Sequence, residues 1–494
     1  MIKFIVGFVL LFISLSTQAQ TFEKTISVSQ PQEKDGRYFY VPFDVPRNAK
    51  SLTISYEYDK KGGANVLDLG VFDARFASAE KNITGFRGWS GGRRNTIFIS
   101  ETEATNGYIA GKIPDGIWRV ILGLYKVAPE GVEVKITVRF NEIDAAARQQ
   151  LTDEKAKTFA FPKNQRIAPA VANGYTWFRG DLHAHTFHSD GNWTIKSLLD
   201  FAENNNLDFL SITEHNTFAH HAELDALAGN YENLLVLRGE EVTTYGGHFN
   251  VWGLPTGELI DFRVAPKDAA RLQTIVDGVH RLGLIASLNH PTALCGGCDW
   301  SYGDWAKMDA VEIWNGAWDL EDEAALKKWD EFLQSGQKIT AIGSSDTHNP
   351  PLAENANGRA VGVPATHVGM KKLTQTEFLA AIKNGRVWIS DNPTAYLLDF
   401  LAFNSKTRFV IGETFPNLTN SIKLECRAKN FPVGSTVSLI SDGKVLLKDD
   451  VKNVESMFAK SFDVQKNSYF RLEVRSETGA MLALTNPIYA QIKR

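Results

Sequence analysis

Residues 180–191 read Gly-Asp-Leu-His-Ala-His-Thr-Phe-His-Ser-Asp-Gly, and the interpretation of the whole chain starts from this stretch. It places three histidines and two aspartates within twelve residues. His183 and His185 stand two positions apart, so on an extended strand both side chains point to one face and can bind one ion together. A polar loop that is merely rich in histidine is the alternative. We favour a metal site because other His, Asp and Glu residues downstream also fall at predicted strand ends.

The composition is that of an ordinary globular protein. The chain has 494 residues, of which 43% are hydrophobic and 22% charged. This length predicts roughly three domains. The formal net charge of -4 gives no basic field for a nucleic acid, so no nucleic-acid partner is expected.

Residues 1–19 have the pattern of a secretory signal peptide. Lys3 precedes an apolar run over 4–13, and a small polar region then ends at Ala19. The apolar run is too short for a membrane span. We therefore expect cleavage near Gln20, a periplasmic or secreted protein, and no stable membrane insertion.

The chain contains three cysteines, and two of them form a Cys-x-x-Cys pair. In an oxidising compartment Cys295 and Cys298 can close as a small disulfide, which leaves Cys426 single. A zinc knuckle is less favoured because no second Cys-x-x-Cys or nearby His pair completes four ligands. A thioredoxin-like redox pair is also disfavoured, since no helical pattern follows directly.

Residues 20–141 predict an N-terminal β-sandwich domain. Short alternating segments are separated by Gly, Pro and Asn, as in antiparallel sheets. The predicted strands are 38–41, 52–56, 66–69, 97–99, 118–122 and 132–140.

A motif within this domain, Gly88-Trp-Ser-Gly-Gly92, matches the G-x-S-x-G pattern of a nucleophile elbow. That elbow needs a helix after the serine, whereas a strand-like run follows here, so we do not expect a nucleophile. The neighbouring Arg87, Arg93 and Arg94 could reach an anion, although a solvated basic loop is the simpler interpretation.

Residues 142–173 are predicted to be a linker, helical near 145–151 and then broken by prolines.

Residues 174–394 alternate between strand and helix, which predicts parallel βαβ units. Seven strands near 178–183, 207–213, 234–242, 284–289, 309–314, 338–343 and 386–390 indicate a closed barrel rather than an open sheet. Helices are expected at 195–203, 218–227, 267–281, 321–335 and 376–383. Residues 395–494 return to a β pattern, which predicts a second, smaller sandwich domain.

Titratable side chains collect at the ends of the predicted barrel strands, where such barrels place their reacting groups. In chain order these are His183, His185, Asp190, Glu214, His215, Glu240, Glu241, His248, His290, Asp346 and His348. Nitrogen and carboxylate ligands in this number exceed the needs of one tetrahedral ion. They indicate two or three divalent ions such as Zn, Mn or Fe.

These motifs resemble those of the PHP (polymerase and histidinol phosphatase) metallohydrolases. Within that superfamily the chain resembles the CehA/McbA-type enzymes, which are similar to carbaryl hydrolase. The matching motifs are Asp181-Leu-His-Ala-His-Thr186, Ser189-Asp-Gly191, Thr213-Glu-His-Asn216, Gly239-Glu-Glu-Val242, Gly247-His248, Asn289-His-Pro291 and Ser345-Asp-Thr-His348.

The resemblance implies an α/β fold built on a distorted (β/α)7 PHP barrel with two or three metal ions. It assigns His183, His185, Glu241 and Asp346 to the first ion, Glu241, His248 and His290 to the second, and Asp190, His215 and His348 to the third. Glu241 would bridge two ions. It is chosen over Glu240 because the family glutamate falls two residues after the glycine, and alternation sends its neighbour to the other face. Glu214 stands where the family usually has Asp and is expected to orient His215.

Glu241, Asp346 and His188 are the candidate catalytic residues. His188 can face the mouth of the site as a proton donor or substrate contact, and a structural role is equally plausible. His220, His221, His280 and His367 match no ligand motif and are expected to be surface or packing residues.

Two ions about 4 Å apart can lower the pKa of a bridging water and supply hydroxide at neutral pH. The first hypothesis is therefore an exported phosphoesterase acting on monoesters or diesters of a small-molecule, glycan-linked or lipid-linked substrate. The alternative within hydrolases is cleavage of a carboxylic ester, carbamate or amide. A third hypothesis is a non-catalytic glycan- or surface-binding protein with exposed aromatics such as Trp89. The complete ligand set disfavours it.

Overall fold

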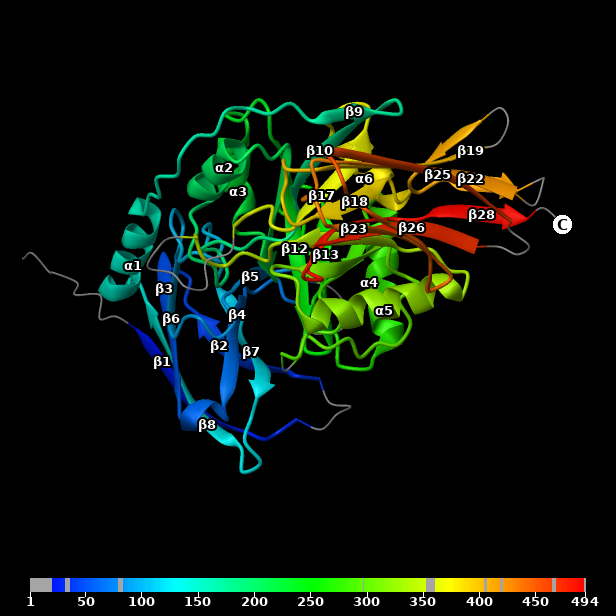
Figure 1. The fold of residues 1–494 in the computed structure, drawn as a ribbon. Helices are drawn as coiled ribbons and strands as arrows, with labels where there is room; N and C mark the ends of the chain where they lie inside the picture. Colours follow the sequence, from blue (N-terminus) through cyan, green and yellow to red (C-terminus); the bar gives the residue numbers. More distant parts are fainter. Residues whose placement is uncertain are drawn as a thin grey trace, which may run out of the picture.

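A computed structural model describes residues 20–31, 36–78, 83–295, 297–351, 360–403, 407–417, 421–463 and 468–492. The predicted signal peptide (1–19) lies outside the described residues. Arg359, which the sequence offers as a further cation to orient a phosphate, also lies outside them. None of the described helices is both long and apolar enough to cross a membrane. The chain lies in three sections, with N-terminal sheets (blue to cyan) on one side, a helix-covered central sheet (green to yellow) in the middle, and C-terminal strands (orange to red) on the other side (Figure 1).

The N-terminal section contains two antiparallel sheets that share one core. The first has the order β1(Thr21–Val28), β8(Val132–Phe140), β3(Ser51–Tyr58), β6(Thr96–Ser100). The second has the order β2(Tyr38–Val45), β7(Gly116–Lys126), β4(Val66–Phe72), β5(Phe86–Trp89). Side chains alternate along β8 between buried and exposed, and the buried ones join those of the facing sheet in one apolar cluster.

All six strands predicted here are present, and β1 and β5 are additional. Strand β1 is mostly exposed and β5 is fully buried, so neither shows the alternation by which strands are recognised. A short 3-10 turn, η1(Lys61–Gly63), precedes β4. The linker contains α1(Ala145–Ala156), capped by the Asp144 side chain, and the short β9(Ala170–Ala172).

The central section is one mixed sheet. Its strands are β10(Tyr175–Asp181), β11(Phe209–His215), β12(Leu235–Thr244), β13(Gly247–Trp252), β14(Ala286–Leu288), β15(Ala310–Asn315), β16(Thr340–Ser344), β17(Ala365–Met370) and β18(Val387–Ser390). Pairing is parallel from β10 to β12 and from β14 to β16, and antiparallel around β13 and β17. The sheet curls so that Thr366 of β17 exchanges hydrogen bonds with Gly343 of β16.

The expectation of seven parallel strands is therefore wrong in two places among the described residues, because β13 and β17 were not predicted. Strand β13 follows β12 after a two-residue turn, and its Gly247-His248 start resembles a loop carrying a ligand. Strand β17 contains Thr366 and His367, which are buried despite being polar. Both strands pair antiparallel with their neighbours, which a βαβ pattern does not foresee. A closed barrel stays a prediction.

Five helices cover the described central sheet, close to where the sequence predicts them. They are α2(Ile195–Asn204), α3(His221–Ala228), α4(Ala269–Arg281), α5(Leu320–Gln334) and α6(Gln375–Lys383). Side-chain caps begin four of them: Thr194 before α2, Asp268 before α4, Asp319 before α5 and Thr374 before α6.

The C-terminal strands are continuous with the central sheet. Strand β27(Met481–Thr485) pairs with β18, and β26(Ser468–Arg475), β23(Thr436–Ser441), β24(Lys444–Asp450) and β28(Ile488–Ile492) extend the sheet, with β21(Thr414–Asn417) paired to β28. A separate sheet has the order β20(Arg408–Val410), β19(Leu397–Phe403), β22(Ser421–Lys429), β25(Glu455–Asp463). Trp177 of β10 and Trp388 of β18 belong to the same core as these strands. This section is therefore more closely joined to the centre than a flanking domain would be.

A buried ion pair holds α5 against the C-terminal strands. Arg471 of β26 is 1% exposed and donates from Nε to Asp330 Oδ1 at 2.9 Å, and Asp330 also accepts from Tyr469. We expect Asp330→Ala to lower the free energy of unfolding by about 3 kcal/mol, because it leaves a buried guanidinium paired only with Glu473. Urea denaturation measures this.

The control is Glu425→Ala, which removes an exposed ion pair with Lys423. It should cost less than about 1 kcal/mol. Equal losses in the two variants would contradict a structural role for the Asp330 pair.

Candidate metal centre

All nine side chains predicted as metal ligands lie together at one end of the central sheet. Among the described residues, these side chains, together with Cys298, form four overlapping groups. Within each group, one ligand atom from every residue lies within 4.8 Å of those of the others. The groups are His183, His185 and Glu241; His183, His290 and Asp346; His185, Asp190, His215 and His348; and His248, His290 and Cys298. The assignment of these residues to particular ions stays a prediction.

Asp181, at the end of β10, fixes the two segments that carry the innermost groups. Its Oδ1 accepts from the backbone N–H of His183 at 3.2 Å and of Ser345 at 3.1 Å. Its Oδ2 accepts from the N–H of Gly362 at 2.7 Å. The buried carboxylate thus holds the His183 strand end beside the loop that carries Asp346.

His183 and His185 present two nitrogen atoms to a common point. His183 Nε2 lies 3.3 Å from Asp346 Oδ1 and 3.4 Å from Glu241 Oε2. His185 Nε2 lies 3.1 Å and 3.5 Å from the same two oxygens. Both nitrogens are buried without a hydrogen-bond partner. Buried polar atoms normally have a partner, so these two call for one, and a cation bound between them and the carboxylates would be that partner.

The sequence interpretation missed Glu312, which orients His183. Glu312 Oε1 lies 3.2 Å from His183 Nδ1, and Oε2 accepts from the N–H of His290 at 3.1 Å. A carboxylate on one ring nitrogen directs the other nitrogen toward the ion and sets the tautomer. A signal was available in the sequence. Glu312 is a single acid within the apolar run of β15, and this predicted strand had no ligand assigned to it, although the strands before it all had one.

Glu241 lies between the groups, as a bridging carboxylate must. Its Oε1 is near His248 Nδ1 at 3.1 Å and His290 Nε2 at 3.3 Å, and it accepts from Asn289 Nδ2 at 3.0 Å. Its Oε2 faces the His183 side. Glu240 points the other way along β12, where its Oε2 accepts from the N–H of Ile260 at 2.7 Å.

The third group is built by the turn after the quoted histidines. An added Cβ on Gly191 would lie 2.3 Å from the His185 carbonyl, so only glycine lets this turn fold back tightly. Asp190 Oδ1 then lies 3.4 Å from His215 Nε2 and 3.2 Å from His348 Nε2. The His185 ring stacks on both of these rings, with centroids 4.3 and 4.2 Å away, and their own centroids lie 5.9 Å apart.

Glu214 does not orient His215 as expected. Its carboxylate accepts hydrogen bonds from the Thr186 N–H and hydroxyl and from the Ser189 hydroxyl. It therefore shapes the 186–189 turn. His215 Nδ1 instead lies 2.6 Å from Thr243 Oγ1. Because Glu214 and His215 are adjacent on β11, they point to opposite faces of the strand.

The charges in the cluster are strongly coupled. Burial raises the pKa of Glu241 and of Asp346, but the His183 ring and its neighbours outweigh burial and hold both pKa values well below their usual range. Burial lowers the pKa of His215, yet Asp190 and Glu241 raise it to about 9. Burial, with His348 and His215, lowers the pKa of His185 to about 3. The carboxylates therefore stay ionised and require positive charge, which divalent ions would also provide.

Two ligand candidates adopt backbone conformations that are rare for residues with a side chain. Asp346 has φ 49° and His290 has φ 25°. Such left-handed conformations cost free energy and persist where the surrounding structure imposes them. Their occurrence at two positions of one cluster supports a functional site.

His188 lies apart from the cluster. Its Nε2 is 3.2 Å from Glu223 Oε2, and it lines a separate cavity together with Lys155 and Phe187. A proton-donor role for His188 stays a prediction. His220, His221 and His367 are buried, as packing residues are, and His280 pairs with Asp309 nearer the surface.

Two of the three arginines considered for anion binding are buried in contacts with other parts of the protein. Arg87 is buried and donates to the carbonyls of Ile109 and Lys112. Arg94 is buried in a pair with Glu154. Arg93 reaches the centre, where it donates to the Asp190 carbonyl at 2.5 Å.

Ser90 and Trp89, in the segment 86–94, were expected to be a non-nucleophilic serine and an exposed aromatic residue. The Ser90 hydroxyl lies 3.0 Å from the Tyr108 hydroxyl, and a strand follows it instead of a helix, as predicted. Trp89, expected to be exposed, is 3% exposed and packs against Phe262, so it offers no free surface.

The N-terminal section also anchors the hairpin that carries Glu241 and His248. Tyr245, at the tip of the β12–β13 hairpin, donates from its hydroxyl to Asp68 Oδ2 on β4 at 2.5 Å. Its hydroxyl lies against Gly123, where an added Cβ would be 1.9 Å away, so this position admits only glycine. The flanking sheets are thus part of the support of the centre.

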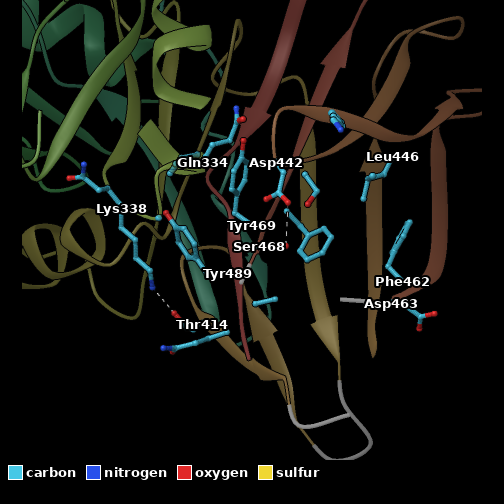
Figure 2. A pocket seen from close by; sticks show the side chains of 18 residues that line it. Gln334, Lys338, Thr414, Asp442, Leu446, Phe462, Asp463, Ser468, Tyr469 and Tyr489 are labelled. Atoms are coloured by element: carbon cyan, nitrogen blue, oxygen red, sulfur yellow. Dashed lines mark hydrogen bonds between the residues drawn. The ribbon is translucent and has the colours of Figure 1, made fainter. Parts of the chain in front are cut away.

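A larger cavity, lined by none of these ligand candidates, lies between the end of α5 and the C-terminal strands (Figure 2). It measures about 1050 Å³ and is lined by Tyr469, Tyr489, Phe462 and Lys338 among others. Lys338 is already engaged, since its Nζ donates to Thr414 Oγ1 at 2.7 Å and lies over the Tyr489 ring. The cavity beside the cluster is smaller, about 240 Å³, and is lined by His290, Cys295, Cys298, Glu312 and Asp346 among others.

No protein-family model and no curated protein sequence matches the chain. A two-domain protein from Bacteroides vulgatus, described as containing a predicted PHP-like metal-dependent phosphoesterase, is 18% identical over 67% of this chain and 100% of its own, with a TM-score of 0.39. An amidohydrolase from Chromobacterium violaceum is 18% identical over 36% of this chain and 90% of its own (TM-score 0.25). A protein from Bifidobacterium adolescentis, provisionally described as a metal-dependent phosphoesterase, is 15% identical over 36% and 91% (TM-score 0.26).

The opposite orientations of Glu240 and Glu241 give a matched pair of variants. We expect Glu241→Gln to bind fewer divalent ions, because it removes the charge shared by two groups. Glu240→Gln should bind as the parent does, since the Glu240 side chain points away from the cluster and burial raises its pKa well above its usual range. Elemental analysis of metal-loaded, desalted protein measures this, and equal metal content in both variants contradicts the assignment.

The anchor of the hairpin can be tested by removing one hydroxyl. We expect Tyr245→Phe to weaken metal binding by about tenfold, in the lower range found for outer partners of metal ligands. Tyr231→Phe is the control, because its hydroxyl donates to Asp200 at 2.8 Å, away from the cluster. Competition with a chromogenic chelator gives the affinities. An unchanged affinity in Tyr245→Phe refutes the anchoring role.

Proposed function

We propose that the chain is a metal-dependent hydrolase of the PHP class. This proposal is supported mainly by nine side chains able to bind metal that lie together at the strand ends. Among them, His183 Nε2 and His185 Nε2 are buried without a hydrogen-bond partner. The quoted sequence motifs further support a place in the CehA/McbA-type subgroup.

The residues present suit two or three divalent ions of borderline character, such as Zn, Mn or Fe. Such ions would activate a water molecule and neutralise charge on the substrate oxygen. The chain's own part is to hold the ligands in place. Glu312 orients His183, Asp181 positions Asp346, and Asn289 donates to Glu241. No serine or cysteine nucleophile is needed.

A phosphate ester is the substrate class we favour, as a monoester or diester on a small, glycan-linked or lipid-linked molecule. Anionic phosphoryl oxygens repel a nucleophile, and a multi-ion cluster offsets that repulsion directly. The alternative is an ester, carbamate or amide. It is favoured by the burial of Arg87 and Arg94, which are engaged in other contacts and are not available to a substrate anion. Arg93, beside Asp190, remains the candidate for contacting a substrate anion.

Export to the periplasm or beyond is part of the proposal, on the strength of residues 1–19. A non-catalytic role in glycan or surface binding is the second candidate. The cavity of about 1050 Å³ with Tyr489 and Phe462 in its lining favours it. The retained ligand set favours catalysis instead, because a binding protein has no use for so many converging acids and histidines.

The reaction class is tested with matched chromogenic substrates. We expect metal-loaded protein to hydrolyse an aryl phosphate monoester or diester with higher kcat/KM than the corresponding aryl ester or carbamate. Chelation should abolish the activity, and Mn or Zn should restore it. A tenfold preference for the carbonyl substrate, about 1.4 kcal/mol, would favour the alternative. Absence of any hydrolysis by protein of full metal content would favour a binding protein.

A further inference from the structure

A sulfur atom lies within the second predicted ion site. The ligand atoms of His248, His290 and Cys298 all lie within 4.8 Å of one another. Cys298 is joined to Cys295 in a disulfide, as the sequence predicts, with Cα atoms 5.3 Å apart. A disulfide sulfur is a weak ligand, whereas a thiolate is among the strongest for zinc-like ions. The redox state of this pair therefore decides whether a thiolate joins Glu241, His248 and His290 as a fourth donor.

The segment that carries Cys298 is held in place independently of the disulfide. On its C-terminal side, Ser301 donates from its N–H and hydroxyl to the Gly246 carbonyl at 2.8 and 2.9 Å. Beside Cys298, the Gly247 N–H donates to the Gly297 carbonyl at 2.9 Å. On the N-terminal side, the Leu294 N–H donates to Glu321 Oε1 at 3.1 Å. Opening the disulfide therefore leaves Cys298 beside the hairpin that carries His248.

The disulfide is also accessible. Cys295 is exposed, and both cysteines line the cavity of about 240 Å³ that His290 and Asp346 also line. The third cysteine, Cys426, is buried in the C-terminal core and offers no competing thiol.

We propose that Cys298 is a redox-dependent metal ligand. In the reduced protein its thiolate joins His248 and His290 at the second ion position, and in the oxidised protein that position lacks this donor. The inference rests on the proposed metal centre. It extends that centre by one residue that the resemblance does not assign, and it makes the occupancy of one ion position depend on a dithiol reductant.

The redox step balances with a dithiol as the named reductant. One thiolate of the dithiol attacks the exposed Cys295 sulfur, the Cys295–Cys298 bond breaks, and Cys298 leaves as a thiolate. The second thiolate of the dithiol then displaces Cys295 as a thiol and closes a cyclic disulfide. Two electrons pass to the cysteines. Of the two protons from the dithiol, one goes to Cys295 and the other to solvent when Cys298 binds the ion.

Cobalt(II) substitution tests the proposal without any assay of activity. A thiolate bound to Co(II) gives a charge-transfer band in the near ultraviolet, which nitrogen and oxygen ligands do not give. We expect the Co(II)-loaded parent to gain this band, at one thiolate per chain, on addition of a non-thiol phosphine in place of the dithiol, which avoids thiol ligands from the reductant. The visible d–d bands should be present before and after reduction.

Two variants make the test specific. Cys295→Ser should show the band without reductant, because Cys298 is then always free. Cys298→Ser should not show it in either state, although it leaves Cys295 as a free thiol. We also expect reduction of the parent to tighten Zn binding at one position by about tenfold or more, the lower end of what ligand partners contribute.

The outcomes separate the two proposals. Visible Co(II) bands without a charge-transfer band in reduced parent and in Cys295→Ser overturn the role of Cys298 and leave the metal centre standing. No Co(II) bands at all overturn both. A charge-transfer band that persists in Cys298→Ser assigns the sulfur to Cys295 and also refutes the inference.

Discussion

The carboxylates of Glu241, which is buried, and of Asp346, which is partly buried, impose the constraint on which the rest of the structure depends. Both are surrounded by histidine rings and stay ionised despite burial. An isolated buried charge is costly, so each needs positive charge at short range. The strands that supply His183, His185, His248 and His290 are arranged around this requirement, which divalent ions would meet most directly.

The supporting structure is drawn from all three sections of the chain. Asp181 joins the first strand end to the loop of Asp346, and Glu312 sets the orientation of His183. The N-terminal sheets reach the centre through Arg93 and through Asp68, which accepts from Tyr245. The flanking section therefore supports the ligands rather than forming an independent attachment.

The clustering of the nine ligand candidates was easier to predict from the sequence than the sheet that carries them. The nine ligand candidates could be found because each stands in a short polar motif at the end of an apolar run. Strands β13 and β17 could not be found in this way. An antiparallel strand can follow its neighbour without a helix between them, and polar residues such as His367 conceal the burial of β17. The role of Glu312 and the contacts of Glu214 could not be predicted either. They depend on which strands lie next to each other, and a local sequence pattern does not contain that information. Trp89 was misjudged for the same reason, since the surface that covers it belongs to another section of the chain.

Anomalous X-ray diffraction from crystals loaded with Zn or Mn tests the central claim most directly. We expect at least two anomalous peaks in the cluster. One should lie among His183, His185, Glu241 and Asp346 and the other beside Glu241, His248 and His290, each at about 2.0–2.3 Å from its ligand atoms. Well-diffracting crystals in which the cluster has no peak, while ions occupy only surface positions, would contradict it.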